Sequence, residues 1–175
     1  MRIIEFAGLS PEQVDQAARV LGAAFANMDA QAEVASFVAD TGRHALAALD
    51  GADLLGWIGW LEGYSHAWEL HPLVVDAQFQ RRGIGTALVG ELESRARAAG
   101  ILTLWLGADD ESGGTNLYGV DVFPSVLRHA AFAEQTTRHP IRFYRKVGFQ
   151  VVGLLPDVNG FGKPDILMAK RVAAS

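Results

Sequence analysis

The order of apolar and polar positions along the chain predicts strands and helices that follow one another closely. The segment Met1 to Phe6, apolar apart from Arg2 and Glu5, is typical of a first strand. Ser10-Pro11-Glu12-Gln13 then predicts a helix start, because serine can cap it, proline suits its first position and glutamine completes a capping box. Apolar residues at helical spacing predict the buried stripe of that helix: Val14, Ala17, Ala18 and Leu21.

A second helix is expected from about Ala30 to Asp40, with Gly42 just beyond its end.

Three strands are expected next. The runs Ala45 to Leu49 and Leu54 to Leu61 flank Asp50-Gly51, a pair favoured in tight turns, so they predict a hairpin. Trp68 to Val75 is a third apolar run of strand length. A glycine-containing turn, Gln80 to Gly85, then leads into a long helix. That helix is expected to end near Ala99, where a glycine closes it.

The remaining pattern completes a mixed α/β chain. Ile101 to Leu106 predicts a buried strand, and a polar, glycine-rich loop follows it over Asp109 to Asn116. Two helical stretches and two closing strands are expected at Pro124–Ala133, Pro140–Val147, Phe149–Leu155 and Ile166–Lys170. This order of elements predicts one α/β domain over residues 1–175.

Composition narrows the classes of function. The chain has 175 residues, enough for one domain with a sizeable core, and no apolar run approaches the ~20 residues of a membrane span. The first residues do not resemble a signal peptide, so a cytoplasmic protein is expected. The absence of cysteine excludes disulfides, cysteine metal ligands and a cysteine nucleophile. The five histidines lack metal-ligand spacing, so no metal is predicted.

The charge balance bears on the partner. A formal net charge of −5 argues against nucleic acid, whose binding proteins usually present a basic face. An acidic surface instead concentrates cations, so a positively charged small molecule is the expected substrate.

The segment Gln80-Arg81-Arg82-Gly83-Ile84-Gly85-Thr86 is the most specific local signal. Its glycines allow a tight turn in which successive N–H groups point at one anion, and the following helix start adds partial positive charge. A Rossmann fingerprint would need a third glycine where Leu88 stands, and a P-loop would need Gly-Lys-Ser/Thr. The segment therefore predicts a pyrophosphate site, the alternative being a capped helix with two exposed arginines.

This segment resembles the acetyl-CoA site of the GCN5-related N-acetyltransferases. Phe143-Tyr144-Arg145-Lys146-Val147-Gly148-Phe149 resembles a late segment of the same family. Further collinear motifs resemble one subgroup, the aminoglycoside 6'-N-acetyltransferases, and the similarity covers about Leu46 to Lys170. These motifs are Trp68–Val75, Leu106–Asp110, His139-Pro140-x-x-Phe143-Tyr144 and Gly162–Lys170.

The resemblance implies a single GNAT-like domain with a mixed, mostly antiparallel, splayed β-sheet flanked by helices. It also implies direct acetyl transfer in a ternary complex, without a covalent enzyme intermediate, and a homodimer. The expected acetyl-CoA contacts are His71, Pro72, Leu73, Gln80, Arg81, Arg82, Gly83, Ile84, Gly85, Thr86, Thr137 and Tyr144. Many family members carry an asparagine where Thr137 stands.

Pro72 favours a break or bulge within its strand. Proline cannot donate to a β-ladder, so it belongs at an edge, a bulge or a break. Backbone groups from His71 to Leu73 would then be left for a ligand, and the resemblance implies that they bind the pantetheine arm and polarise the thioester carbonyl. The alternative is a simple edge strand.

Four residues carry the expected chemistry: Glu69, His71, Leu73 and Tyr144. Glu69 is the candidate general base, because a substrate amine is mostly ammonium at neutral pH and must lose a proton before it attacks. Tyr144 is the candidate general acid for the departing thiolate. The structural alternatives are that Glu69 is a solvated glutamate on a strand and that Tyr144 is a core residue whose hydroxyl is hydrogen-bonded.

The acceptor site is expected to be acidic. Asp109, Asp110 and Glu111 cluster on a loop, and Asp121 is expected on the same surface, where carboxylates would bind the ammonium groups of an aminoglycoside. A solvated polar loop is the alternative. Phe25, Tyr64 and Trp68 are the candidate apolar walls.

Other functions stay open at this point. The acceptor could be a polyamine, another small amine or a protein N-terminus, or the chain could be a CoA-binding sensor without turnover. Gly63-Tyr64-Ser65-His66-Ala67 loosely resembles a hydrolase nucleophile elbow. It lies between two predicted strands rather than at a strand-to-helix turn, which disfavours a hydrolase.

Overall fold

The computed structural model describes residues 1–39 and 42–172. It divides into two compact units, Met1–Leu102 and Thr103–Ser175, and each is described by itself.

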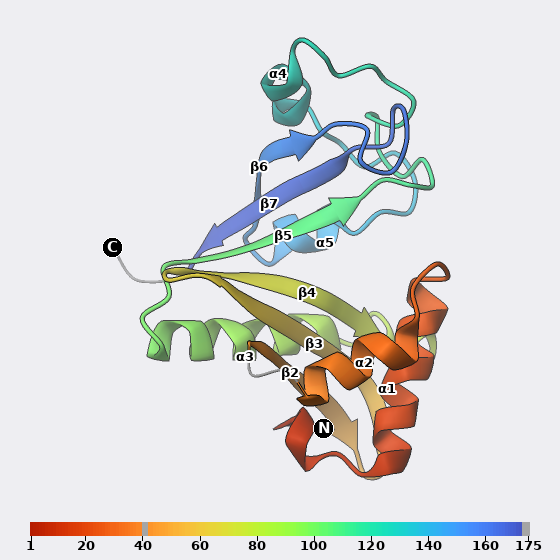
Figure 1. Ribbon diagram of the computed structural model, residues 1–175, viewed down its shortest axis with the longest axis vertical. Coiled ribbons are helices and arrows are strands. Elements are labelled where there is room, and N and C mark those ends of the chain that lie inside the picture. The colour runs from red at the N-terminus through yellow and green to blue at the C-terminus, as the bar shows by residue number, and fades with distance from the viewer. Residues whose placement is uncertain (40–41, 173–175) are drawn as a thin grey trace. The chain divides into compact units, whose positions relative to one another are not determined.

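The first unit is built on four antiparallel strands in the order β1-β2-β3-β4 (Figure 1). Their bounds are β1 Arg2–Glu5, β2 Arg43–Asp50, β3 Asp53–Tyr64 and β4 Ala67–Val75. The helices are α1 Pro11–Ala24, α2 Ala30–Ala39 and α3 Ile84–Ala98, with short 3-10 turns η1 Phe6–Gly8 and η2 Ala77–Phe79. The hairpin expected around Asp50-Gly51 is the β2–β3 connection.

Helices α1 and α2 cover one face of this sheet, and α3 lies on the opposite face (Figure 1). The expected capping box begins α1, where the Ser10 side chain accepts from the Gln13 amide and the Gln13 side chain accepts from the Ser10 amide. The indole of Trp57 on β3 donates to the Ala17 carbonyl of α1 at 3.1 Å. The predicted end of α2 at Asp40 lies outside the described residues.

A bulge interrupts the pairing of β3 with β4. Ile58 pairs with Leu73 and Trp60 pairs with Leu70, so His71 and Pro72 together stand opposite Gly59. A Cβ at Gly59 would collide with the His71 carbonyl and with the ring of Phe37. Glycine is therefore needed where the bulged backbone and α2 both press on β3. Of the edge, bulge or break expected at Pro72, the structure has a bulge.

The second unit carries three strands in the order β5-β7-β6, with antiparallel pairs. They are β5 Thr103–Asp109, β6 Gln150–Leu155 and β7 Asp165–Arg171, and two short helices accompany them, α4 Val126–Ala131 and α5 Ile141–Lys146. Helix α4 packs against β6.

The expected α/β fold with a mostly antiparallel sheet and flanking helices is confirmed. The predicted and observed elements differ in their boundaries. The strand predicted from Ile101 begins at Thr103, and the helix predicted over Pro124–Ala133 is shorter in the structure, where α4 spans Val126–Ala131. The single-domain assignment over residues 1–175 stays a prediction. Within residues 1–39 and 42–172, no helix combines the length and apolar character that crossing a bilayer requires.

Candidate active site

Strand β4 presents the candidate base on a half-buried surface. Glu69, His71 and Leu73 are all partly exposed, whereas Trp68 and Leu70, which alternate with them, are buried. Because neighbouring strand residues point to opposite faces, Trp68 does not lie on the same side of the sheet as Glu69. The bulge at His71 and Pro72 begins two residues after Glu69.

A charged cluster surrounds this surface. Oε1 of Glu33, in the first turn of α2, lies 2.9 Å from a guanidinium nitrogen of Arg43 and 3.4 Å from Nε2 of His71. The same Arg43 nitrogen donates to the Ser36 hydroxyl at 3.0 Å. Residues from α2, β2 and β4 therefore meet beside Glu69. His71 was expected at the site from the sequence, whereas Glu33 and Arg43 were not, because their approach depends on tertiary packing.

The electrostatics of Glu69 suit a base. Burial raises the pKa of its carboxyl, and the positive charges of His71 and Arg43 partly offset that rise. A carboxylate that holds a proton more firmly than a solvated glutamate is better matched to accepting one near neutral pH.

The segment Gln80 to Thr86 lies between β4 and α3. The Gln80 side chain donates to the Val75 carbonyl at 3.1 Å, which ties the segment to the end of β4. Arg81 and Gly83 take φ values of +65° and +84°. Among the described residues, no side chain caps the start of α3 at Gly83. The backbone amides in the first turn of α3 and the exposed side chains of Arg81 and Arg82 can therefore bind an anion.

Not every residue of this segment faces outward. Ile84 is buried in the core and can offer a ligand only its backbone, whereas Thr86 is exposed. Arg82 lies over the ring of Phe79, 5.4 Å from its centroid. The geometry fits an anion held by backbone amides, with arginine charge nearby.

Tyr144 lies on α5 in the second unit. It packs edge-on against Phe143 and Phe149, with ring centroids at 5.3 and 5.6 Å. Burial raises the pKa of its phenol above the usual range, so the hydroxyl stays protonated at any physiological pH. A protonated hydroxyl is the state that a general acid needs.

The predicted acidic loop divides into two kinds of residue. Asp110 is fully buried, and its carboxylate accepts hydrogen bonds from the Gly114 amide at 2.6 Å and from the Thr115 amide and hydroxyl at 3.0 and 2.6 Å. The expectation that Asp110 contacts an acceptor is therefore corrected: its oxygens hold the loop. Asp109 and Asp121 are exposed.

Two further residues of this unit support the same loop. The Thr137 hydroxyl donates to the Gly113 carbonyl at 3.2 Å. His139, which the sequence analysis noted only within a motif, contacts the Asp109 carbonyl through Nε2 at 3.1 Å and accepts from the Ile141 amide through Nδ1. Burial lowers the pKa of His139. A neutral ring with its proton on Nε2 satisfies both bonds and fixes the start of α5 to the end of β5.

The three candidate apolar walls differ. Trp68 stacks on Trp60 with ring centroids at 5.5 Å, so it is a core aromatic on the face away from Glu69 and does not line a site around that carboxylate. Tyr64 is 68% exposed, and with Trp68 it borders a surface cavity of about 420 Å³. Phe25, at the end of α1, is partly exposed.

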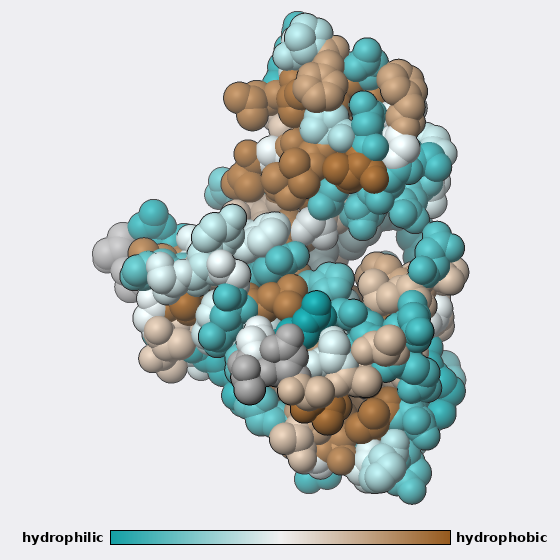
Figure 2. Space-filling view, in the orientation of Figure 1, coloured by the Kyte–Doolittle hydropathy of each residue, from teal (hydrophilic) through white to brown (hydrophobic). Residues whose placement is uncertain are grey.

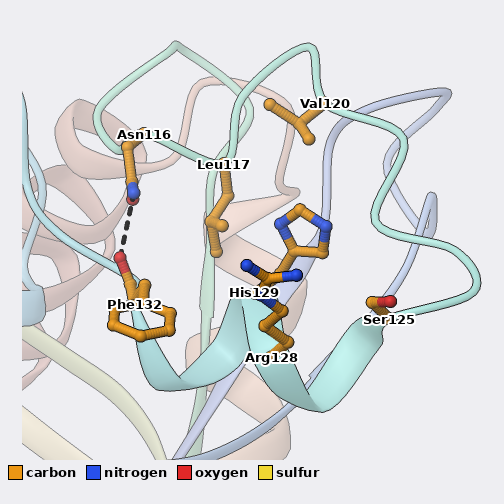
Figure 3. A pocket seen from close by; sticks show the side chains of 7 residues that line it. All are labelled: Asn116, Leu117, Val120, Ser125, Arg128, His129 and Phe132. Atoms are coloured by element: carbon orange, nitrogen blue, oxygen red, sulfur yellow. Dashed lines mark hydrogen bonds between the residues drawn. The ribbon is translucent and has the colours of Figure 1, made fainter.

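A second cavity, of about 360 Å³, lies beside α4 in the second unit. Figure 3 shows Arg128 and His129 of α4 beneath the loop that carries Leu117 and Val120. Asn116 ties this loop to the end of α4 by donating to the Phe132 carbonyl at 2.9 Å. None of the site residues expected from the sequence lines this cavity.

The structure thus brings the expected residues together in two sets. Glu69, His71, Leu73 and the Gln80–Thr86 segment belong to the first unit, and Thr137, Tyr144 and the aspartates belong to the second. Across residues 1–39 and 42–172, no group of three or more histidine or carboxylate side chains could hold a metal ion.

Comparisons with known proteins identify the family of this chain. Residues 13–118 match the model of the acetyltransferase (GNAT) family. The chain is similar to a crystal structure of an aminoglycoside 6'-N-acetyltransferase complexed with coenzyme A, with a TM-score of 0.93 and 36% identity over 100% of this chain and 99% of that one. A search of curated protein sequences gives no match.

Two further solved structures are similar over the same extent. An aminoglycoside 6'-N-acetyltransferase from Enterococcus faecium has a TM-score of 0.92 and 37% identity, covering 100% of this chain and 99% of that one. An aminoglycoside 6'-acetyltransferase of type Ii has a TM-score of 0.74 and 32% identity with the same coverage.

Proposed function

Because this chain belongs to the acetyltransferase (GNAT) family, we propose that it transfers the acetyl group of acetyl-CoA to the 6'-amine of aminoglycosides. The observation that carries the proposal is identity of 36% and 37% with two aminoglycoside 6'-N-acetyltransferases along the whole chain. Such a reaction would inactivate an antibiotic and confer resistance.

The residues present fit acetyl-CoA. The uncapped first turn of α3, with Arg81 and Arg82 beside it, is suited to the pyrophosphate. The bulged backbone from His71 to Leu73 is the candidate contact for the pantetheine arm and the thioester carbonyl. Acetyl-CoA supplies the activated acetyl group as a thioester, and Thr137 and Tyr144 are the candidate contacts from the second unit.

Glu69 acts as the base. Its carboxylate accepts a proton from the acceptor's ammonium, directly or through water, and the neutral amine then attacks the thioester carbonyl. The raised pKa of Glu69 brings its proton affinity closer to that of the group it must deprotonate. Backbone near Leu73 stabilises the developing oxyanion, a contribution of about 3 kcal/mol per donor.

Tyr144 acts as the acid. As the new C–N bond forms and the C–S bond breaks, the sulfur takes a proton from the Tyr144 hydroxyl, and the proton that the acylated nitrogen loses returns to the Tyr144 oxygen through water. Burial keeps that hydroxyl protonated before the reaction. The transfer passes directly from donor to acceptor in a ternary complex, without a covalent enzyme intermediate.

Asp109 and Asp121 are the proposed partners of the acceptor's other ammonium groups, since both carboxylates are exposed. Phe25 and Tyr64 are the proposed apolar contacts. The net charge of −5 favours such a cationic acceptor over nucleic acid.

CoA release from acetyl-CoA tests this function. Kanamycin and tobramycin carry a 6'-amine, whereas paromomycin carries a hydroxyl there, so release is expected with the first two and little with the third. Equal release with paromomycin would contradict the regiochemistry. Binding of acetyl-CoA without release would discard the aminoglycoside and direct the search to polyamines, other small amines and protein N-termini, or to a sensor.

We also propose a homodimer, with the second unit supplying its contact. Exposed apolar side chains lie on α4, at the residue that follows it and on the edge strand β6: Leu127, Phe132, Val152 and Leu155. Figure 2 shows apolar side chains gathered over this unit. Light scattering coupled to size exclusion should give twice the chain mass, and Leu127→Asp with Val152→Asp should give a monomer. A monomer before any substitution would contradict the dimer.

A further inference from the structure

Glu33 connects three elements around the candidate base. Its Oε1 lies 2.9 Å from the Arg43 guanidinium of β2 and 3.4 Å from the His71 ring of β4. The Glu33 side chain is only 20% exposed, so water competes weakly for these contacts. One carboxylate oxygen thus contacts two basic side chains from β2 and β4, the two strands that flank β3.

The core fixes where Glu33 stands. Phe37, one helical turn further along α2, packs edge-on against Trp57 at 5.5 Å and meets Gly59 at the bulge. Arg43 also lies over the Phe37 ring at 5.3 Å from its centroid. Residues four apart share a helix face, so the packing of Phe37 also directs Glu33 to the bulged strand.

The two basic residues that Glu33 holds are the same two that act on Glu69. His71 and Arg43 exert the positive potential that opposes the burial of the Glu69 carboxylate. His71 acts from the same strand, Arg43 acts from β2, and Glu33 acts on both from α2. Among the ion pairs of residues 1–39 and 42–172, none involves Glu69.

We propose that Glu33 is a positioning residue for acetyl transfer: it holds Arg43 and His71 so that neither pairs with Glu69. This inference rests on the proposed function, because it assigns a purpose to an unpaired Glu69. A Glu69 carboxylate paired with arginine would accept a proton less readily and would be occupied when the acceptor's ammonium arrives.

Glu33→Gln keeps the shape and removes the charge. Turnover is expected to fall about tenfold, below the 10²- to 10⁴-fold range for losing a base outright. The Michaelis constant for acetyl-CoA is expected to stay unchanged. The acidic limb of the rate profile should move to lower pH, because Arg43 and His71 would then stabilise the Glu69 carboxylate.

Two variants separate positioning from general damage. Glu33→Gln combined with Arg43→Gln removes the competing cation, and it should recover most of the lost turnover and return the acidic limb toward its original pH. Glu91→Gln removes a glutamate that pairs with Arg95 at 3.2 Å on α3, and it should leave the pH profile unchanged. An unmoved acidic limb in Glu33→Gln, or no recovery in the double variant, would overturn the inference.

A titration without substrate keeps this test apart from the proposed function. The Glu69 side chain, labelled with ¹³C and assigned with Glu69→Gln, can be titrated by NMR in the parent protein and in Glu33→Gln. A lower pKa of Glu69 in Glu33→Gln supports the inference even if no aminoglycoside is acetylated. An equal or higher pKa overturns it even if kanamycin is a good substrate.

Discussion

The carbonyl oxygen of His71 occupies the space that a side chain at Gly59 would need. The Phe37 ring closes the same space from α2, with one ring carbon only 2.6 Å from where a Cβ would stand. The bulge that follows Glu69 therefore depends on glycine in the neighbouring strand.

Gly59→Ala should destabilise the protein by about 1–3 kcal/mol, the usual cost of an overpacked core position. Because relief requires the bulge or α2 to move, turnover should fall as well. Urea unfolding and CoA release measure the two effects. Gly63→Ala is the matched control, since nothing lies within 4 Å of its added Cβ. Equal stability of the two variants would mean that the bulge adapts freely.

Glu69→Gln should lower turnover with an aminoglycoside by about 10²- to 10⁴-fold while leaving acetyl-CoA affinity nearly intact. The parent rate should fall as pH decreases through a pKa above 4.5, the usual value for glutamate, because burial disfavours the ionised carboxyl. Steady-state rates from pH 5 to 9 and calorimetric titration of acetyl-CoA give both quantities. Unchanged turnover would remove the base role from Glu69.

Tyr144→Phe should reduce turnover about tenfold, less than the 10²- to 10⁴-fold typical of a general acid, because a thiolate leaves fairly well without one. The ring contacts with Phe143 and Phe149 persist in the variant, so the melting temperature should change little. Because burial raises the pKa of Tyr144, the parent should lose no activity through this group up to pH 9. Parent-like turnover in Tyr144→Phe would assign the hydroxyl to packing alone.

Asp110→Asn should cost about 1–3 kcal/mol of stability, because an amide nitrogen would face the donors that the carboxylate now satisfies. Asp109→Asn should leave stability nearly unchanged and should raise the Michaelis constant for the aminoglycoside. Thermal unfolding and steady-state kinetics on the pair check both statements. If Asp110→Asn instead raised the Michaelis constant for the aminoglycoside and kept its stability, Asp110 would belong to the acceptor site.

Local signals predicted most of the fold. The Ser10 capping box and the Asp50-Gly51 turn involve residues close in sequence, so their physics could be evaluated without tertiary structure. The glycine-containing turn before α3 was predicted for the same reason, although α3 already begins at Ile84, inside the predicted turn. Pro72 indicated an irregular strand because proline has no backbone N–H to donate to a β-ladder, whatever the tertiary structure around it.

The candidate site was predicted less completely, because parts of it depend on contacts distant in sequence. Asp109 and Asp110 look alike in the sequence, and only the fold buries one of them. Trp68 lies on the opposite face of β4 from Glu69, because neighbouring strand residues alternate between faces, so it does not belong to one wall with Phe25 and Tyr64. The Glu33–His71 contact joins residues 38 positions apart and leaves no periodic pattern.

The position of the new acetyl group tests the central claim most directly. Kanamycin can be incubated with acetyl-CoA and the protein, and the product analysed by two-dimensional NMR. The account predicts a single acetyl group on the 6'-nitrogen. An acetyl group on another amine, or no acetylated product under conditions where acetyl-CoA binds, would contradict it.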